Sequence, residues 1–134
     1  MRLEDAEVRR WLEKARHDWM VVQRILKDGG PELDVAAFHC QQAVEKVLKA
    51  YLISQRRSFE KIHDLRRLLD YCVEREAAFE SLRDDVEPLT IYAVAFRYPG
   101  PSDPMIEEVI RAERVVAKAW QFIADRLPPH VVPE

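Results

Sequence analysis

The sequence predicts an all-α fold, an up-and-down bundle of four to five helices. Apolar residues recur at three- and four-residue intervals over long stretches, which is the spacing of one buried helix face. Only three glycines occur in 134 residues, and no segment alternates polar and apolar residues with the period of a strand. We expect one domain over residues 1–134, with a core from about 7 to 127 and a loose tail over 128–134.

The first two helices follow from their apolar stripes. The first is expected from Glu7 to Lys27, because seven apolar residues share one face: Val8, Trp11, Leu12, Ala15, Trp19, Val22 and Leu26. The second is expected from Leu33 to Gln55, with an inward stripe of Cys40, Ala43, Val44, Val47, Leu48, Tyr51 and Leu52. A separate polar stripe on it holds Gln42, Glu45, Lys46 and Lys49. Glu45 and Lys49 lie four residues apart, the spacing of a favourable helical ion pair.

Three further helical segments are expected after a basic connector. The third helix begins near His63-Asp64 and turns Leu65, Leu68, Leu69 and Cys72 inward. Pro88 falls within the next apolar rhythm, so we expect a short helical piece before it and a helix from Pro88 to Arg97. Asp103 and Pro104 predict the N-cap and first residue of the last helix. Its inward residues are expected to be Ile106, Val109, Ile110, Val116, Ala117, Trp120, Ala124 and Leu127.

Composition narrows the class of protein. No stretch approaches about 18 apolar residues and the first residues lack an apolar signal core, so no membrane span and a cytoplasmic location are expected. Cys40 and Cys72 are expected to be buried free thiols in preference to a disulfide. No zinc-type spacing, di-iron motif or phosphate-binding glycine loop occurs, so we expect no metal and no cofactor.

Charge is distributed unevenly along the chain. The whole protein carries a net charge of −3, which argues against a grip on nucleic acid by the entire surface. The segment 41–67 has seven basic against three acidic residues, whereas 74–87 has six acidic against two basic. Two interpretations remain open: a solvated helix face, or a surface for a phosphate-bearing ligand or RNA with the acidic segment meeting another protein.

Two residues are candidates for chemistry. His63 stands at a helix start beside the basic connector, where it could transfer protons or simply anchor the loop. Arg97 ends a helix, where it could bond the last carbonyls or bind phosphate with its planar donors. Of the other histidines, His39 is expected to be a packing residue, His17 a surface residue and His130 part of the tail.

The segment from Phe38 to Leu52, with its run Gln41-Gln42-Ala43-Val44-Glu45-Lys46, resembles the HEPN (higher eukaryotes and prokaryotes nucleotide-binding) domain family. His63-Asp64-Leu65 and Arg97-Tyr98-Pro99 resemble later family motifs in the same order. The resemblance implies a homodimeric helical bundle of a prokaryote that accompanies a minimal nucleotidyltransferase in a toxin–antitoxin-like pair. Many members are metal-independent RNases that use an arginine followed four to six residues later by a histidine.

This chain departs from the RNase pattern, because Ser102 and Asp103 stand where that histidine is expected after Arg97. Whether it is an enzyme is therefore uncertain, and the pattern leans against it. We expect a dimeric module that binds a nucleotide, RNA or a nucleotidyltransferase, with its ligand site among His63, Asp64, Arg97, Tyr98, Lys46 and Lys49. The alternatives are an endoribonuclease toxin that uses Arg97 with His63, and a dimeric adaptor that binds no nucleic acid.

Overall fold

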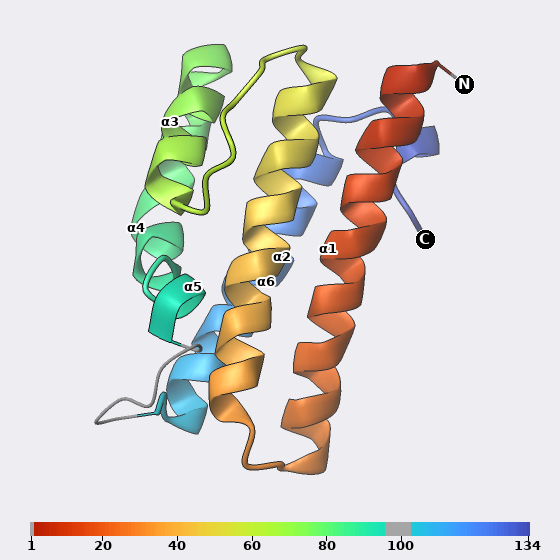
Figure 1. Ribbon diagram of the computed structural model, residues 1–134. Helices are drawn as coiled ribbons and strands as arrows, with labels where there is room; N and C mark the ends of the chain where they lie inside the picture. The colour runs from red at the N-terminus through yellow and green to blue at the C-terminus, as the bar shows by residue number, and fades with distance from the viewer. Residues whose placement is uncertain (1, 96–102) are drawn as a thin grey trace.

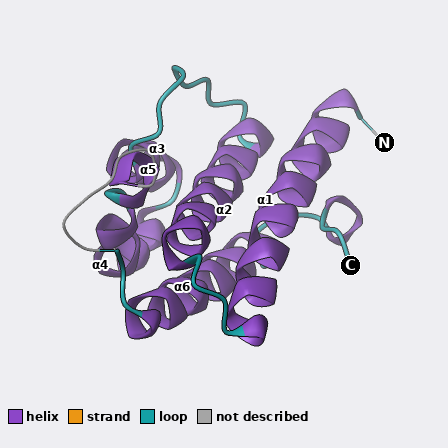
Figure 2. Ribbon diagram, turned by 60° about the horizontal axis from the view of Figure 1, so that its bottom comes forward, coloured by secondary structure: helices purple, strands orange, loops and turns teal. Residues whose placement is uncertain are grey.

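The computed structural model describes residues 2–95 and 103–134. Helices and short 3-10 turns are the only regular elements in these ranges, which confirms the all-α prediction (Figures 1 and 2). The long helices are α1 (Leu3–Asp28), α2 (Leu33–Ser54), α3 (Leu65–Arg75) and α6 (Ile106–Ala124). The short elements are η1 (Ala77–Leu82), α4 (Arg83–Val86), η2 (Glu87–Leu89), α5 (Tyr92–Ala95) and η3 (Pro129–Val131).

Helix α2 is the centre of the bundle. It lies between α1 and α3 with α6 behind it, and the connection over 55–64 runs along part of its remaining side (Figure 1). Thirteen of its 22 residues are buried, including all seven that the apolar stripe predicted. A helix enclosed on three sides needs apolar residues around most of its circumference, which is what this segment supplies.

The turn between α1 and α2 depends on a glycine. Gly29 has φ of 62°, in the left-handed region, and its backbone N–H bonds the carbonyl of Ile25. Glycine adopts this conformation without the steric cost that a Cβ would add. The chain therefore leaves α1 at Asp28 and reverses direction into α2.

The segment between α3 and α6 differs from the expected helix over 88–97. Pro88 lies in the 3-10 turn η2, and the described part of the segment is divided between η2 and α5. Proline has no N–H to continue an α-helical ladder, so the chain tightens into a 3-10 turn there. Residues 96 and 97, at the end of the expected helix, lie outside the described residues.

The last helix begins two residues later than expected. Met105, and not Asp103, is its N-cap, and the Met105 N–H bonds the Glu108 carboxylate at 3.2 Å. Glu108 supplies the acceptor that Asp103 was expected to supply, so the short polar residue is not needed at the cap. Ile106 and Ile110, both expected to face inward, are 42% and 36% exposed.

The C-terminal tail, expected to be loose, packs against the first half of α1. Val131 is only 1% exposed, and Arg9 Nη1 donates to the His130 carbonyl at 3.0 Å. His130 Nε2 lies 3.1 Å from the Asp5 carboxylate, and this hydrogen bond is the main reason that the pKa of Asp5 is lowered. One buried valine and two polar contacts thus order a segment that has no apolar periodicity of its own.

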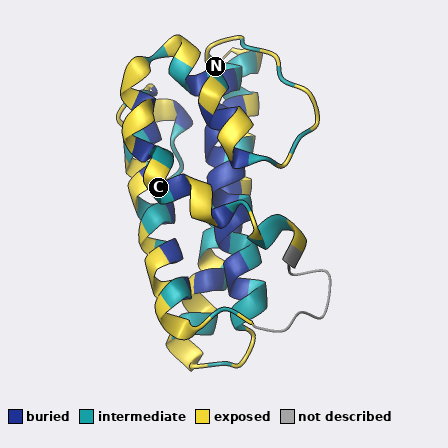
Figure 3. Ribbon diagram, turned by 90° about the vertical axis from the view of Figure 1, so that its left-hand side faces the viewer, coloured by how far each residue is buried: buried dark blue, intermediate teal, exposed yellow. Residues whose placement is uncertain are grey.

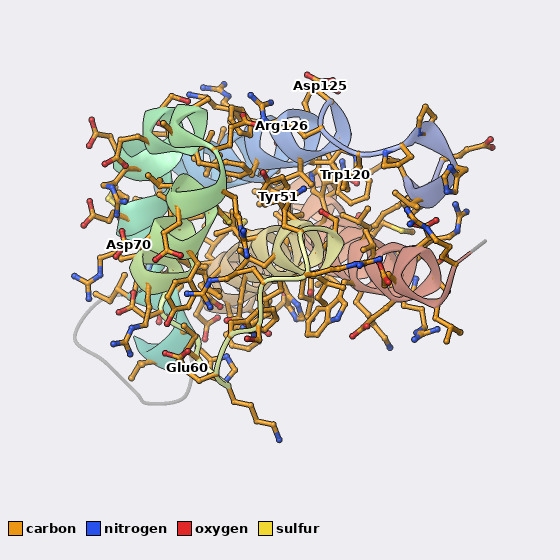
Figure 4. All side chains as sticks on the ribbon, turned by 90° about the horizontal axis from the view of Figure 1, so that it is seen from above. Tyr51, Glu60, Asp70, Trp120, Asp125 and Arg126 are labelled. Atoms are coloured by element: carbon orange, nitrogen blue, oxygen red, sulfur yellow. The ribbon has the colours of Figure 1, made fainter. Side chains whose placement is uncertain are left out.

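The core is continuous through the inner faces of the helices, while the outer faces are exposed (Figure 3). Phe79 of η1 joins the α3–α4 region to the rest, because its ring lies 4.5 Å from that of Tyr51 and 4.8 Å from that of Phe122. Seen from above, Tyr51 lies inside the bundle and Asp70 at its outer edge (Figure 4). Among the described residues, no helix has the length and apolar character needed to cross a membrane.

Replacing Phe79 tests this connection. Phe79→Ala removes a fully buried ring from between two aromatic partners, so the free energy of unfolding should fall by about 3–5 kcal/mol. Leu3→Ala is the control, because Leu3 is 90% exposed and its truncation should change stability by less than about 0.5 kcal/mol. Urea denaturation followed by circular dichroism measures both. Equal effects in the two variants would contradict the role of Phe79.

Candidate functional site

A polar cluster lies within the otherwise apolar centre of the bundle. Gln41, Glu45 and Lys49 follow one another at four-residue steps on α2 and are 0%, 2% and 6% exposed. Burying a charge is costly unless it is paired and hydrogen-bonded. Here Glu45 accepts from Gln41 Nε2 and from Lys49 Nζ, each at 3.1 Å. The predicted Glu45–Lys49 pair is present, but it is buried and does not belong to a solvated stripe.

His63 completes this group, which we call the Glu45 cluster (Gln41, Glu45, Lys49 and His63). Its Nδ1 lies 3.0 and 3.2 Å from the two carboxylate oxygens of Glu45. Gln41 Nε2 also donates to the His63 backbone carbonyl at 3.1 Å. The same α2 residues therefore fix both the ring and the backbone of His63, at the point where the connection enters α3.

The contact with Glu45 determines which nitrogen of His63 is available. An ionised carboxylate only accepts hydrogen bonds, so Nδ1 carries the proton in this contact. In the neutral ring Nε2 is then an acceptor, and the His63 side chain is 63% exposed against 3% for Glu45. A carboxylate that orients an imidazole in this way prepares the second nitrogen to take a proton or to accept a hydrogen bond from a ligand.

Aromatic rings shield the cation of the Glu45 cluster. The Lys49 ammonium lies 5.6 Å from the ring centre of Trp11 on α1 and 5.7 Å from that of Phe59 in the connection. A cation near aromatic faces is stabilised by their quadrupoles while water is kept away. Lys49 is therefore buried within the Glu45 cluster, where its positive charge is neutralised by Glu45.

A second polar group, the Asp18 cluster, joins α1 to α2. Asp18 is 7% exposed and accepts from His39 Nδ1 at 2.7 Å and from Lys46 Nζ at 2.6 Å. His39 is therefore a hydrogen-bond partner of a buried carboxylate and not only a packing residue. The sequence analysis missed Asp18, although a signal exists: it falls three and four residues from the buried Ala15 and Val22, so an acid is placed at a core position that demands a partner.

The basic segment 41–67 is largely neutralised within the chain. Six of its seven cations form ion pairs: Lys46–Asp18, Lys49–Glu45, Arg56–Glu4, Arg57–Glu74, Arg66–Asp64 and Arg67–Glu60. Only Lys61 of this segment has no ion pair with another described residue. Most of the acidic segment 74–87 is paired in the same way, through Arg57, Arg126, Arg83 and Lys118. The local excess of charge in the sequence is thus much smaller on the folded surface.

The structure brings together only some of the expected site residues. Asp64 is the N-cap of α3 and accepts from the Arg66 N–H at 3.0 Å. Although burial acts to raise it, hydrogen bonds from Arg66 leave the pKa of Asp64 below its ordinary value. His63 and Lys49 share the Glu45 cluster, whereas Lys46 belongs to the Asp18 cluster. Arg97 and Tyr98 lie outside the described residues.

Other candidate sites on the described surface do not involve these residues. A cleft of about 450 Å³ lies between α6 and the α4–α5 segment, with Tyr92 and Pro88 on one wall. Cys40 and Cys72 are free and buried, as expected, and burial raises the pKa of the Cys40 thiol to about 12. No group of three or more metal-binding side chains occurs in the described part of the chain.

A double-mutant cycle tests the energetics of the Glu45 cluster. Lys49→Met leaves a buried carboxylate without its cation, so the free energy of unfolding should fall by about 3 kcal/mol. Combining it with Glu45→Gln removes that unpaired charge and should recover at least about half of the loss. Lys118→Met is the control, since its pair with Asp85 is exposed and worth less than about 1 kcal/mol. If Lys49→Met costs no more than this control in urea denaturation, the cluster does not stabilise the fold.

Comparison with known proteins agrees with the resemblance in the sequence. The family model described as HEPN domain matches residues 8–126 of the 134-residue chain, which includes most of α1 and all of α2, α3 and α6. Neither a curated protein nor a solved structure matches the chain significantly. At the level of the family, the match supports a nucleotide-associated or RNase-like module. The matched region spans nearly the whole bundle, and the chain belongs to the HEPN domain family.

Proposed function

We propose that this chain is a nucleotide- or RNA-associated HEPN module that acts as a cytoplasmic homodimer. It would partner a minimal nucleotidyltransferase in a toxin–antitoxin-like system, as its family suggests. The observation that carries the ligand-binding part is the Glu45 cluster. The Glu45 carboxylate, itself held by Gln41 and Lys49, binds Nδ1 of the His63 ring, and the His63 side chain is 63% exposed.

The chemistry of His63 suits a ligand with hydroxyl and phosphate groups. Neutral Nε2 accepts a hydrogen bond from a ribose hydroxyl, and the protonated ring donates to a phosphate oxygen. Glu45 holds the ring through Nδ1, and Gln41 and Lys49 in turn hold the carboxylate in place.

The orientation of His63 by Glu45 also supports one half of a second candidate function, an endoribonuclease that uses Arg97 with His63. His63 Nε2 would take the proton of a ribose 2′-hydroxyl while that oxygen attacks the adjacent phosphorus. The bond from phosphorus to the 5′-oxygen breaks, the imidazolium returns the proton to that oxygen, and a 2′,3′-cyclic phosphate results. Arg97 would stabilise the charge on the phosphate oxygens.

Nuclear magnetic resonance of histidine-labelled protein tests the site directly. Adding a mononucleotide or a short RNA should shift the imidazole signals of His63, and His63→Gln should weaken binding by about five- to tenfold, since one hydrogen bond is lost. His130→Gln is the matched control, because the His130 side chain is 55% exposed in the C-terminal tail and lies outside both polar clusters. Unchanged His63 signals with every ligand would overturn the proposal and leave the dimeric adaptor.

Incubation with RNA separates the two candidates. Production of cyclic-phosphate ends by the wild type, lost in both His63→Gln and Arg97→Ala, would establish the endoribonuclease. Cleavage that persists unchanged in both variants would remove the enzymatic interpretation. RNA that stays intact while His63 signals shift would support the binding module.

An exposed apolar surface supports the homodimer. Ile91, Val94, Met105 and Ile106 are 64%, 60%, 64% and 42% exposed. They lie where α5 meets the start of α6, as shown by the hydrogen bond of 3.2 Å from Tyr92 to Glu108. Exposed apolar side chains gathered at one end of a bundle are typical of an interface.

Light scattering during gel filtration tests this surface. The wild type should elute as a dimer, and Ile106→Glu should yield monomers, because a charge in an apolar interface is costly. Leu3→Glu is the control, since Leu3 is 90% exposed at the other end of the bundle. A wild type that is monomeric at all concentrations, or an Ile106→Glu variant that remains dimeric, would show that this surface is not the interface.

A further inference from the structure

Among the described residues, nine lysine and arginine side chains have no ion pair, and five of them lie on α1: Arg10, Lys14, Arg16, Arg24 and Lys27. Within the described part of the chain, Arg10, Lys14 and Arg24 form no ion pair or hydrogen bond through their side chains. Together with His17 they are all exposed, and we call these four residues the α1 ridge. The basic segment 41–67, in contrast, keeps a single unpaired cation, Lys61.

The spacing of the α1 ridge places its members in one row. Arg10, His17 and Arg24 follow at seven-residue intervals, which is close to two helical turns, and Lys14 stands between the first two. At 1.5 Å per residue the row from Arg10 to Arg24 is about 21 Å long. Helix α1 lies at the edge of the bundle, so neither α3 nor the α2–α3 connection reaches its outer face (Figures 1 and 4).

Acidic residues do little to cancel this row. Between Arg10 and Arg24, helix α1 contains Glu13, which binds Arg9 at 3.2 Å, and Asp18, which is buried under Lys46. The unpaired acids Glu7 and Asp28 stand beyond the two ends of the row. A protein with net negative charge therefore carries on α1 a row of cations that no described carboxylate pairs, in addition to the separate unpaired residues Arg75, Arg111 and Arg114.

We infer that the α1 ridge binds the phosphate backbone of RNA, without regard to base sequence, and so holds a strand alongside the bundle. The inference rests on the proposed association with RNA. It adds the surface that would attract the RNA electrostatically. A row of cations about 21 Å long on a convex helix matches successive phosphates of a polymer. It does not enclose a mononucleotide, which requires a pocket.

The ridge is less suited to a membrane surface. An interfacial helix inserts an apolar face, but α1 buries its apolar residues against α2. Its exposed large hydrophobic residues are Leu3 at its start and Met20, 17 residues apart in the sequence. The observations thus favour a polyphosphate strand over a lipid bilayer.

Fluorescence anisotropy with a labelled single-stranded RNA of about twenty nucleotides, titrated at several salt concentrations, tests the ridge. Arg10→Gln with Arg24→Gln should weaken binding at about 0.1 M salt by roughly 25-fold. The slope of log affinity against log salt should become shallower by about 1.4, because each phosphate contact contributes about 0.7. Arg10→Lys with Arg24→Lys should keep the wild-type slope, since the charge is retained.

The matched control removes the same charge from another surface. Arg56→Gln with Arg67→Gln lowers the net charge equally, and both side chains are exposed partners of Glu4 and Glu60. This variant should bind RNA like the wild type. Equal losses of RNA affinity in the two double variants would show that net charge alone determines binding, and would overturn the inference about the α1 ridge. A loss of affinity in the control variant only would overturn it as well.

Two further outcomes separate the ridge from the proposed function. If RNA shifts the His63 signals and Arg10→Gln with Arg24→Gln binds normally, the ridge is wrong while the His63 site stands. If the wild type binds no RNA and no ligand shifts His63, both are wrong. Binding to vesicles rich in phosphatidylserine or to an acidic protein, without binding to RNA, would assign the ridge to another partner and overturn this inference.

Discussion

The arrangement of the bundle depends on how the carboxylate of Glu45 is satisfied. Glu45 stands on the most enclosed helix and contacts two parts of the chain: its own helix through Gln41 and Lys49, and the entry to α3 through His63. Lys49 extends the contacts to the aromatic rings of Trp11 and Phe59. Because an unpaired buried carboxylate would be costly, the connection over 55–64 has one favourable position against α2. The contact between Glu45 and His63 therefore both positions the connection and orients the candidate functional side chain.

Much of the fold could be predicted from the sequence, because periodicity reports burial. The inward residues of α2 and α3 were predicted from their apolar spacing and are buried. Periodicity did not predict the polar groups that are buried in pairs. By their spacing, Glu45 and Lys49 belong to a polar, solvated stripe. In the fold they are buried, because Trp11, Phe59 and His63 lie over them. Periodicity also failed at Ile106 and Ile110, since an apolar residue on a helix does not reveal whether a neighbour covers it. Boundaries near Pro88 and Asp103 depended on local acceptors such as Glu108, which spacing does not indicate.

The sequence predicted only part of the candidate site, because His63 and Lys49 were expected there but Gln41 and Glu45 were not. The order of Gln41, Glu45 and His63-Asp64 pointed to the family, and the structure shows that three of these residues contact one another. The expected role of Lys46 and Lys49 as a source of positive potential was less well founded, because each faces a buried acid. Net charge along a segment does not equal charge on a surface, since pairing partners come from distant parts of the chain. The unpaired cations of α1 illustrate the converse case.

The two buried thiols can be used to measure how the helices of the bundle separate. Cys40 and Cys72 sit in α2 and α3, both are fully enclosed, and burial raises their pKa values, so neither forms a reactive thiolate in the closed fold. A thiol-labelling reagent can therefore reach them only when the helices separate. Because Cys72 lies against the Leu48 carbonyl, its labelling rate tracks separation of α3 from α2, whereas that of Cys40 tracks exposure of the centre of the bundle. The ratio of the two rates measures whether the domain opens as one cooperative unit or peels from the α3 side first.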